Sequence, residues 1–474
     1  MVAAKKRVFL TGATGNMGIE VLREFVRRSD RFEVTALVMP GDRERVIIEE
    51  FAHEPSVTVQ YGDVTSYQTV ESCVARSDIV AHLGALVSPY ADEHPQRTTE
   101  VNVGGALNII AAVRAQPDPA SVAVIMIGSV AEFGDRNPPL HWGRIGDPLA
   151  PSEYDNYAQS KISAERALVD SGLPRWAWLR QTGIFHPGML AIRDAIMLHV
   201  PLGGVLEWVS AVDSARLIAN ACEDDAPEEF WGGIYNIGGG AGWRLTNWEL
   251  QLRIGQALGV RDIRRWYDRN WFATENFHGL WFTDSDALED LLHFRSGGFE
   301  QALEDAVAKQ SALTRLARFI PTWLVKRSVI APLCRGERGP MSWINENDEA
   351  RIRAYFGSRQ AWESIGDWST FSPPTPSRVP VLLDHGYDES QRRSTWKRST
   401  LREAARFRGG ELGDAPARVD DATPLPWTCA DGHAFMGSPR LVLRAGHWCP
   451  VCVTDTAGFE RQAERNPFLA QLFG

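Results

Sequence analysis

Short runs of apolar residues alternate with amphipathic stretches from residue 8 to residue 240. The runs of strand length are FEVTALVM, VTVQYGDV, DIVAHLGA, VAVIMIGS and WAWLRQTGIF. Residues 101–114 and 161–171, which lie between such runs, have the apolar spacing of helices. Nearly continuous apolar strands separated by helices are typical of a parallel sheet covered on both faces. The pattern therefore predicts an α/β domain with a doubly wound sheet.

A glycine-rich turn joins the first predicted strand to the first predicted helix. Val8–Leu10 leads into TGATGNMG at 11–18, and Ile19, Leu22 and Val26 then share one helical face. Glycines let a ligand approach the backbone, and a helix N-terminus offers unpaired N–H groups and a positive dipole end. A glycine triplet can also be a structural turn. The order strand, turn, helix favours a dinucleotide pyrophosphate, which binds beyond the carboxyl ends of the strands.

Length, composition and charge limit the class of protein. A chain of 474 residues is too long for one compact core, so we expect two or three domains. Hydrophobic residues make up 44% and charged residues 23%, as in soluble globular proteins. The net charge of −10 argues against a chain that coats nucleic acid. The N-terminus lacks a signal-peptide pattern, and no run reaches the ~18 residues of a membrane span. We expect a cytoplasmic enzyme or binding protein without a membrane partner.

A tyrosine and a lysine four residues apart are the second candidate for chemistry. YAQSK at 157–161 places Tyr157 and Lys161 on one helical face. A phenol with a pKa of about 10 is a poor base near neutral pH. The lysine charge is expected to lower that pKa. Such a pair can also be a solvated helix face, but here it follows both the glycine turn and Ser129 at the end of a predicted strand. We therefore interpret it as catalytic.

These motifs occur in the order found in a known family. They are TGATGNMG at 11–18, GDV at 62–64, HLGA at 82–85, NVGGALN at 102–108, GSVAEFG at 128–134, YAQSK at 157–161, LRQTGIFHPG at 179–188 and YNIGGG at 235–240. Over roughly residues 5–290 the sequence resembles the extended short-chain dehydrogenase/reductase family, the NAD(P)-dependent epimerase/dehydratase group. The resemblance implies a Rossmann sheet with a smaller α/β substrate-binding part.

The resemblance also implies roles for individual residues. Tyr157 is expected to be the general acid/base, and Lys161 to hold the nicotinamide ribose. Ser129 is expected to orient the substrate oxygen, and Asn102 to support the site through the neighbouring helix. The other residues expected to contact the cofactor are Gly12, Thr14, Gly15, Asn16, Met17, Gly18, Asp63, Val64, Gly84, Ala85 and Ile184. For the aspartate a turn role is the alternative, and for the isoleucine a core role.

The end of the second predicted strand bears on the choice of cofactor. NAD-preferring proteins have an acidic residue there, which binds the ribose 2′-hydroxyl. In LVMPGDRER that position is Met39, followed by Asp42, Arg43 and Arg45. The missing carboxylate removes the main barrier to a 2′-phosphate, and Arg43 is close enough in sequence to bind it. We expect NADP(H), with NAD(H) as the alternative.

Departures from the family pattern narrow the range of reactions that we expect. Dehydratases of the family carry an Asp-Glu pair just after the catalytic hydroxyl, where this chain has Val130 and Ala131. Glu132 follows one residue later, either as a substrate contact or as a loop carboxylate. Nucleotide-sugar enzymes often place an arginine where this chain has Leu206. His186 replaces a common glycine and either reaches the substrate or has no role.

The expected function is therefore an NAD(P)-dependent oxidoreductase. It interconverts a ketone and a secondary alcohol on a non-nucleotide small molecule. One alternative is a sugar-nucleotide epimerase with tightly bound NAD. The other is a non-catalytic dinucleotide-binding regulator or scaffold. The catalytic set of serine, tyrosine and lysine weighs against the regulator.

Cysteine and histidine cluster near the C-terminus. Cys429-x3-His433 and Cys449-x2-Cys452 are two ligand pairs separated by 15 residues. This spacing suits a tetrahedral Zn²⁺ with three thiolates and one imidazole, and His447 is a rival for the fourth ligand. The segment resembles a small zinc ribbon. Four protein ligands leave no open coordination position, so the predicted zinc is structural.

The chain divides into three predicted parts. Residues 1–290 form the Rossmann domain with its substrate-binding segments, 291–385 a helical extension with a proline-rich linker, and 386–474 a basic helix plus the zinc-ribbon-like module. The aromatic-rich stretch 260–345 is expected to be core, with an apolar pocket wall as the alternative. The basic helix is expected to be a solvated face rather than a nucleic-acid site. A small-molecule substrate is the expected partner, and a homodimer is compatible with these features.

Overall fold

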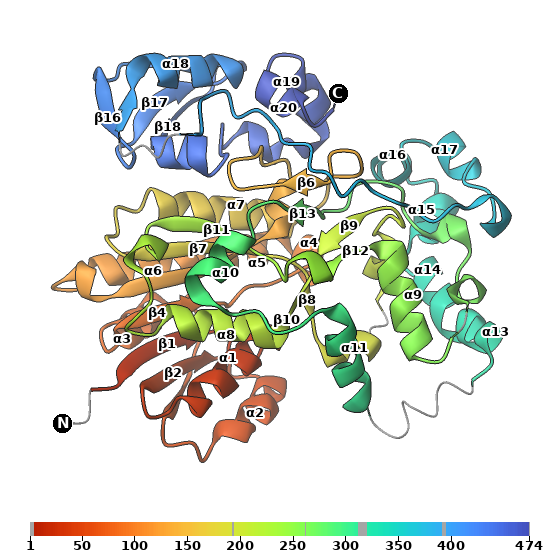
Figure 1. The fold of residues 1–474 in the computed structure, drawn as a ribbon, viewed down its shortest axis with the longest axis horizontal. Helices are drawn as coiled ribbons and strands as arrows, with labels where there is room; N and C mark the ends of the chain where they lie inside the picture. The colour runs from red at the N-terminus through yellow and green to blue at the C-terminus, as the bar shows by residue number, and fades with distance from the viewer. Residues whose placement is uncertain (1–3, 192–193, 261, 311–319, 391–394, 474) are drawn as a thin grey trace.

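A seven-stranded sheet forms the centre of the computed structural model, which describes residues 4–191, 194–260, 262–310, 320–390 and 395–473. The strand order is β11-β7-β5-β4-β1-β2-β3, and every neighbouring pair is parallel (Figure 1). The strands are β1 (Lys6–Thr11), β2 (Phe32–Val38), β3 (Val57–Tyr61), β4 (Ile79–His82), β5 (Ala123–Ser129), β7 (Trp176–Gln181) and β11 (Gly233–Ile237). The predicted parallel sheet is confirmed.

Helices cover both faces of this sheet. On one face lie α1 (Asn16–Arg27), α8 (Ala211–Ala221) and α10 (Asp286–Leu292), and on the other α3 (Tyr67–Val74), α6 (Gly105–Arg114) and α7 (Asn156–Val169). Because side chains alternate along a strand, Val8 and Leu10 join the first core while Phe9 joins the second. Burial on both faces explains why the strands read as continuous apolar runs.

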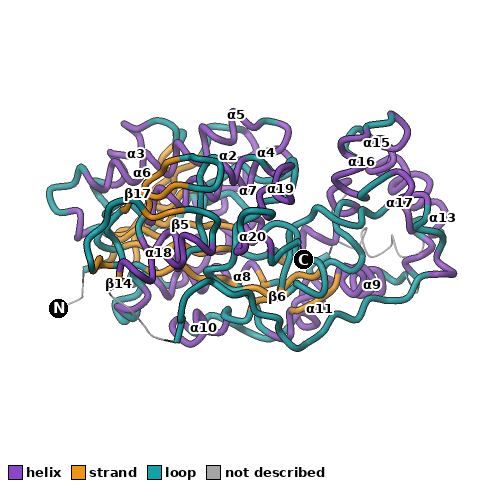
Figure 2. Tube along the Cα trace, turned by 90° about the horizontal axis from the view of Figure 1, so that it is seen from above, coloured by secondary structure: helices purple, strands orange, loops and turns teal. Residues whose placement is uncertain are grey.

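A second, more irregular part lies beyond the carboxyl ends of the strands. Its paired short strands are β6 (Trp142–Gly143) with β13 (Trp281–Phe282), β8 (Ile184–Phe185) with β10 (Val209–Ser210), and β9 (Val205–Glu207) with β12 (Arg244–Thr246). Its larger helices are α9 (Asn247–Ala257), α11 (Phe299–Ala308), α15 (Pro340–Glu346) and α16 (Glu349–Phe356). Figure 2 shows α15 and α16 at the end of the molecule away from the central strands.

The remaining helices of this region and of the sheet edges are short. They are α2 (Asp42–Ile48), α4 (Tyr90–Glu93), α5 (Pro95–Thr98), α13 (Thr322–Val325), α14 (Ala331–Arg335) and α17 (Arg359–Glu363). Tyr267, Trp271 and Trp281 are buried in apolar clusters, so the expectation that the aromatic-rich stretch is core is confirmed for these side chains. Among the described residues no helix combines the length and apolar character needed to cross a bilayer.

The predicted proline-rich linker is an extended arm held against the first domain. The indole nitrogen of Trp142 donates to the carbonyl oxygen of Ser377 over 2.9 Å, and the guanidinium of Arg378 lies 4.2 Å from the centre of the Trp281 ring. Residues 371–389 contain no helix or strand. The arm therefore lies along the substrate-side strands β6 and β13 before it enters the C-terminal module.

The C-terminal module is an independent small core that rests on α7 (Figure 1, top). Its elements are β14 (Thr395–Lys397), α18 (Arg398–Phe407), β15 (Glu411–Leu412), β16 (Arg418–Asp420), β17 (Leu425–Thr428), β18 (Ala434–Gly437), α19 (Phe459–Ala463) and α20 (Pro467–Ala470). Trp396, Leu401 and Trp427 share its apolar core, whereas Leu441 is buried in the core of the central sheet. The module is therefore packed on the α7 side of the sheet domain.

A buried histidine ties the arm to the loop that follows β6. His385 Nε2 lies 2.9 Å from Asp147 Oδ1, and His385 Nδ1 lies 3.1 Å from Glu389 Oε2. Burial alone would lower the pKa of His385, but the two carboxylates outweigh it and raise the pKa above 6.5. The folded protein thus binds this proton more tightly than the unfolded chain does.

This raised pKa predicts a loss of stability at alkaline pH. The contribution of His385 is fully present below the unfolded pKa and disappears as pH rises through the higher folded pKa. We expect the free energy of unfolding of His385→Gln to depend less on pH than that of the wild type between about pH 6 and about pH 9. Denaturant titrations at both pH values measure this difference, and parallel pH profiles would contradict it.

Candidate active site

The glycine turn between β1 and α1 is shaped for close approach to its neighbours and to a ligand. Gly12 has a φ of +74°, and a Cβ there would lie 2.6 Å from the backbone nitrogen of Gly84. A Cβ on Gly18 would lie 2.0 Å from the carbonyl oxygen of Gly12. Helix α1 begins at Asn16 with Gly15 as its N-cap, so no capping side chain covers the N–H groups of the first turn. This cradle fits a dinucleotide pyrophosphate.

The other positions expected to bind the cofactor follow the carboxyl ends of the strands. Gly84 donates its N–H to Thr11 Oγ1 over 3.0 Å, which joins the ends of β1 and β4. Met39 follows β2 and is 47% exposed, and the exposed Arg43 pairs with Glu44. Further predicted positions, which follow β1, β3, β4 and β7, are Thr14, Met17, Val64, Ala85 and Ile184.

Two polar residues whose roles the sequence left open have protein partners here. Asp63 accepts from Arg97 over 2.7 Å and from the N–H of Thr65 over 2.9 Å. Burial would raise the pKa of Asp63, but these bonds hold it below its usual range. His186 Nε2 lies 3.1 Å from Asn16 Nδ2, so this histidine sits against the glycine turn. The aspartate is a turn residue in this geometry, and its contact with adenine stays a prediction.

The serine, tyrosine and lysine come together at the end of β5. Ser129 is the last residue of that strand, and Tyr157 lies in the first turn of α7, whose N-cap is Asp155. Ser129 lies close enough to the phenol of Tyr157 to act on its pKa. Lys161 Nζ lies 5.8 Å from the centre of the Tyr157 ring and donates to the carbonyl oxygen of Ile127 over 2.8 Å.

The expected lowering of the tyrosine pKa is wrong for this geometry. Burial raises the pKa of Tyr157 well above its usual value and outweighs the lowering effect of the nearby Ser129. Lys161 does not offset burial, because its ammonium is directed at the carbonyl of Ile127. Burial also lowers the pKa of Lys161 to about 8. At neutral pH the phenol is therefore protonated and set to act as an acid.

Asn102 links the loop after β4 to the catalytic helix. Its side chain accepts from the N–H of Leu86 over 2.8 Å and donates to the carbonyl oxygen of Leu86 over 2.9 Å. The same amide donates to Ser160 Oγ over 2.8 Å, one residue before Lys161. Asn102 thus holds α7 in place from a neighbouring helical stretch, Thr99–Gly104.

Glu132 does not face the substrate, because its side chain is fully buried. It lies in the 3₁₀-helical turn Val130–Phe133, where Glu132 Oε1 accepts from the N–H of Ser129 over 2.7 Å. Glu132 Oε2 lies 3.2 Å from Arg180 Nε, and Arg180 also binds Glu165 over 2.7 Å. The alternative that Glu132 contacts the substrate is therefore excluded.

The pKa values of the two carboxyl groups in this cluster shift in opposite directions. Burial and the neighbouring Glu165 raise the pKa of Glu132 well above its usual range. Burial would also raise the pKa of Glu165, but Arg180 keeps it below the usual range. Glu132 is therefore the more readily protonated of the two. Sequence reasoning missed Glu165 and Arg180, and the only signal was the position of Glu165 four residues after Lys161.

The four predicted metal ligands come together in the C-terminal module. The ligand atoms of Cys429, His433, Cys449 and Cys452 all lie within 4.8 Å of one another. Cys429 Sγ and Cys452 Sγ are 3.6 Å apart, and each lies 3.4 Å from His433 Nδ1. Zinc bond lengths imply tetrahedral edges of about 3.8 Å between sulfurs and about 3.6 Å between sulfur and nitrogen. The donor set therefore fits Zn²⁺.

His447, the rival ligand, points away from the cluster. Its Nε2 lies 3.3 Å from Glu165 Oε1, and its side chain is 2% exposed. It therefore contacts the carboxylate of α7 rather than completing the metal site. The fourth ligand in this geometry is His433.

Comparison with known proteins agrees with the fold. Residues 8–173 match the sequence model of the NAD dependent epimerase/dehydratase family. The 3 beta-hydroxysteroid dehydrogenase/Delta 5-->4-isomerase of Mycobacterium tuberculosis is 23% identical over 376 residues, which cover 65% of this chain and 95% of that protein. No single relative defines the activity at this level of identity.

Two solved structures share the fold. A double mutant of a dTDP-glucose 4,6-dehydratase from Streptomyces venezuelae with bound NAD is 22% identical, with a TM-score of 0.52, over 67% of this chain and 98% of its own. A UDP-glucose 4-epimerase from Thermus thermophilus in complex with NAD is 20% identical, with a TM-score of 0.50, over 64% of this chain and 100% of its own.

Residues 8–173 thus match the sequence pattern of the NAD dependent epimerase/dehydratase family on a parallel α/β sheet. The chain is an enzyme similar to oxidoreductases and epimerases. This agrees with the resemblance drawn from the motifs.

Proposed function

We propose that this enzyme interconverts a ketone and a secondary alcohol on a non-nucleotide small molecule, with NAD(P) as the redox partner. The observation that carries the proposal is that Ser129 at the end of β5 meets Tyr157 and Lys161 at the start of α7. Because a relative is named a 3 beta-hydroxysteroid dehydrogenase, a cyclic secondary alcohol of the hydroxysteroid type is the first substrate class to test.

The chain's own residues handle the proton that accompanies hydride transfer. The nicotinamide cofactor, when bound, supplies or accepts the hydride. Ser129 donates a hydrogen bond to the substrate oxygen and orients it. The protonated phenol of Tyr157 gives its proton to that oxygen as a ketone is reduced, and takes a proton back as an alcohol is oxidised. Lys161, whose ammonium is directed at the carbonyl of Ile127, is assigned to the nicotinamide ribose.

The surroundings of Leu206 support a substrate without a diphosphate. The adjacent Glu207 is fully buried, and its carboxylate accepts from Arg244 over 2.7 Å and from Ser285 over 2.5 Å. The nearest cation is therefore neutralised by a buried carboxylate and is not directed at a ligand. A diphosphate would need unpaired positive charge at this place.

The residues after Ser129 support oxidoreduction rather than dehydration. Val130 and Ala131 are buried and carry no group that can move a proton. Glu132 is the first carboxyl group in the loop, but it is turned inward onto Arg180. Elimination of water needs an acid and a base at the substrate carbon, and neither residue type is available there.

A substrate panel separates this proposal from its main rival. The purified enzyme is mixed with NAD⁺ or NADP⁺ and either secondary alcohols, including a 3β-hydroxysteroid, or UDP-glucose. Net reduction of cofactor in step with ketone formation supports the proposal. Conversion of the sugar nucleotide without net cofactor reduction would make the enzyme an epimerase.

We propose NADP(H) as the preferred cofactor, because Met39 leaves the end of β2 without a carboxylate. We expect NADPH to bind at least as tightly as NADH in fluorescence titrations. Met39→Asp is expected to weaken NADPH binding about tenfold, or roughly 1.4 kcal/mol, by repulsion of the 2′-phosphate. Met39→Asn serves as the control, because asparagine has the size of aspartate without its charge. Clear preference of the wild type for NADH would show that Asp42 sets the choice instead.

We also propose that the cluster of Cys429, His433, Cys449 and Cys452 holds one structural Zn²⁺. The distances between the four donor atoms support this assignment. Four protein ligands fill a tetrahedral shell and leave no position for a substrate. The metal therefore serves to fold the module.

A further inference from the structure

We infer that the C-terminal module is part of the catalytic site, because its turn at residues 445–447 completes a buried network that positions Ser129. This inference rests on the proposed function, which gives Ser129 a catalytic role. Within the network, Arg180, Glu165 and Glu132 are positioning residues. They act through Ser129 and do not touch the reacting atoms.

The module reaches the network through two contacts. Arg180 Nη2 donates to the carbonyl oxygen of Ala445 over 2.8 Å, and His447 Nε2 lies 3.3 Å from Glu165 Oε1. The side chains of Arg180 and Glu165 are 0% exposed. A buried guanidinium and a buried carboxylate are costly unless every hydrogen-bonding direction is filled. The module supplies Arg180 with the carbonyl acceptor of Ala445 and places the polar ring of His447 beside Glu165.

The same network continues to the catalytic serine. Arg180 Nε lies 3.2 Å from Glu132 Oε2, and Glu132 Oε1 accepts from the N–H of Ser129. A Cβ on Gly128 would lie 2.6 Å from Glu132 Oε1, so the carboxyl group packs tightly beneath the end of β5. Three successive contacts therefore connect the module with the residue that orients the substrate oxygen.

The backbone at the interface is built for this close approach. Gly446 has a φ of +79°, and a Cβ there would lie 2.1 Å from the carbonyl oxygen of Asp147. Only glycine lets the turn place Ala445 and His447 against the network. The metal ligand Cys449 follows His447 by two residues, so the metal cluster fixes where this turn lies.

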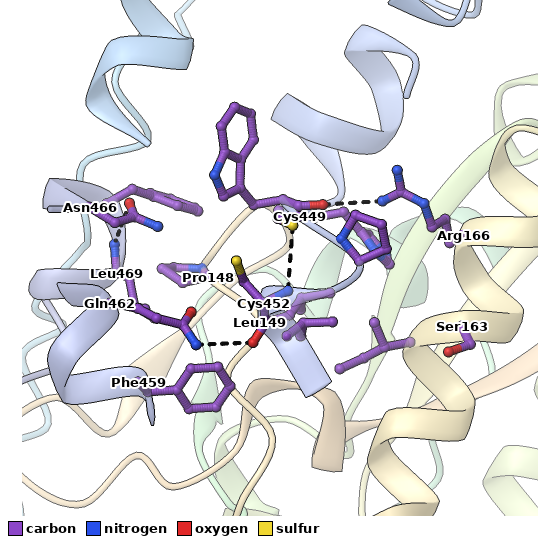
Figure 3. A pocket seen from close by; sticks show the side chains of 17 residues that line it. Pro148, Leu149, Ser163, Arg166, Cys449, Cys452, Phe459, Gln462, Asn466 and Leu469 are labelled. Atoms are coloured by element: carbon purple, nitrogen blue, oxygen red, sulfur yellow. Dashed lines mark hydrogen bonds between the residues drawn. The ribbon is translucent and has the colours of Figure 1, made fainter. Parts of the chain in front are cut away.

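Hydrogen bonds join the C-terminal end of helix α7 to the module. Arg166 donates to the carbonyl oxygen of Trp448 over 3.2 Å, and the N–H of Ser438 donates to Asp170 over 3.1 Å. Figure 3 shows Arg166 reaching from α7 toward the chain at Cys449, on the rim of a cavity of about 60 Å³ between the two parts. Because α7 also carries Tyr157 and Lys161, the module contacts the helix of this pair as well as the network that leads to Ser129.

Substitution of His447 tests the inference in the full-length enzyme. His447→Leu keeps the size but removes the contact with Glu165, and His447→Gln keeps a donor. We expect His447→Leu to lower kcat by roughly 10- to 100-fold, with unchanged Kd for NAD(P)H and zinc still bound. His447→Gln should recover most of the loss. If His447→Leu only destabilised the fold, kcat and cofactor binding would fall together. His447→Gln would then not restore kcat.

A pair of glycine variants provides an independent test. Gly446→Ala forces the turn away from Asp147, and Gly172→Ala, outside the metal cluster, introduces the same left-handed strain at φ +72° with no atom within 4 Å of the added Cβ. We expect only Gly446→Ala to lower kcat. Equal kcat values in the two variants would overturn the inference.

Hydrogen exchange separates failure of the inference from failure of the proposed function. If the wild type turns over no secondary alcohol, the proposed function fails, and exchange still reports on the network. In His447→Leu the amides of residues 129–133 should exchange faster than in the wild type while zinc is retained. Unchanged exchange there, or unchanged kcat in an enzyme that is active, would overturn the role of the module.

Discussion

Tyr157→Phe is expected to lower turnover by ~10²- to 10⁴-fold, the range typical of losing a general acid/base. We propose that the phenol, whose pKa burial raises further above neutrality, donates the proton to the substrate oxygen. Phenylalanine keeps the ring and its packing. Cofactor binding, measured by fluorescence titration, should therefore stay near the wild-type value.

Tyr154→Phe is the matched control for this variant. Tyr154 lies three residues before Tyr157, is 38% exposed and stacks on Tyr355 with ring centres 6.4 Å apart. Removing its hydroxyl should leave turnover close to that of the wild type. Near-wild-type turnover in Tyr157→Phe, on any substrate the enzyme accepts, would refute the assignment.

Loss of the C-terminal metal is expected to have the largest effect on stability. A structural zinc contributes on the order of 10 to 16 kcal/mol to the folding of isolated finger peptides. The core of the module is small, so we expect its fold to depend on the cross-link that a bound metal provides. Metal analysis should find one zinc per chain, and Cys449→Ser or Cys452→Ser should lose it. Residues 425–455 should then exchange their amide hydrogens much faster.

The buried Cys334 supplies the control for these variants, because it lies outside the cluster. Cys334→Ser should retain the zinc and the protection of the module. Cofactor binding should survive in Cys449→Ser, since the glycine turn belongs to the β1–α1 connection, while turnover should fall with the loss of the network around Arg180. A zinc-free native protein with a protected C-terminal module would contradict the metal site.

The sheet and the cluster of cysteine and histidine side chains could be predicted from the sequence because both follow from local patterns. The run at 123–129 is buried throughout and became β5, and the order strand, glycine turn, helix fixed the place of α1. Ligand pairs with short spacing likewise need only a tight turn each. Such features depend on neighbours along the chain, which the sequence displays directly.

The buried network could not be predicted, since it joins residues far apart in the chain. Glu132, Glu165 and Arg180 meet His447 only after the module packs on α7. The predicted direction of the Tyr157 pKa shift was wrong for the same reason. Sequence spacing gave the distance from Tyr157 to Lys161 along a helix, but burial, which dominates the pKa, is a tertiary property.

The most direct test of the proposed oxidoreductase activity follows the hydrogen that is transferred. A secondary alcohol of the hydroxysteroid type, deuterated at its carbinol carbon, is incubated with the enzyme and NADP⁺ or NAD⁺, and the released nicotinamide is examined by mass spectrometry. We predict that deuterium appears in the reduced cofactor in equal amount to the ketone formed. Absence of deuterium from released cofactor, together with its retention in an epimerised sugar when C4-deuterated UDP-glucose is supplied, would contradict the proposal.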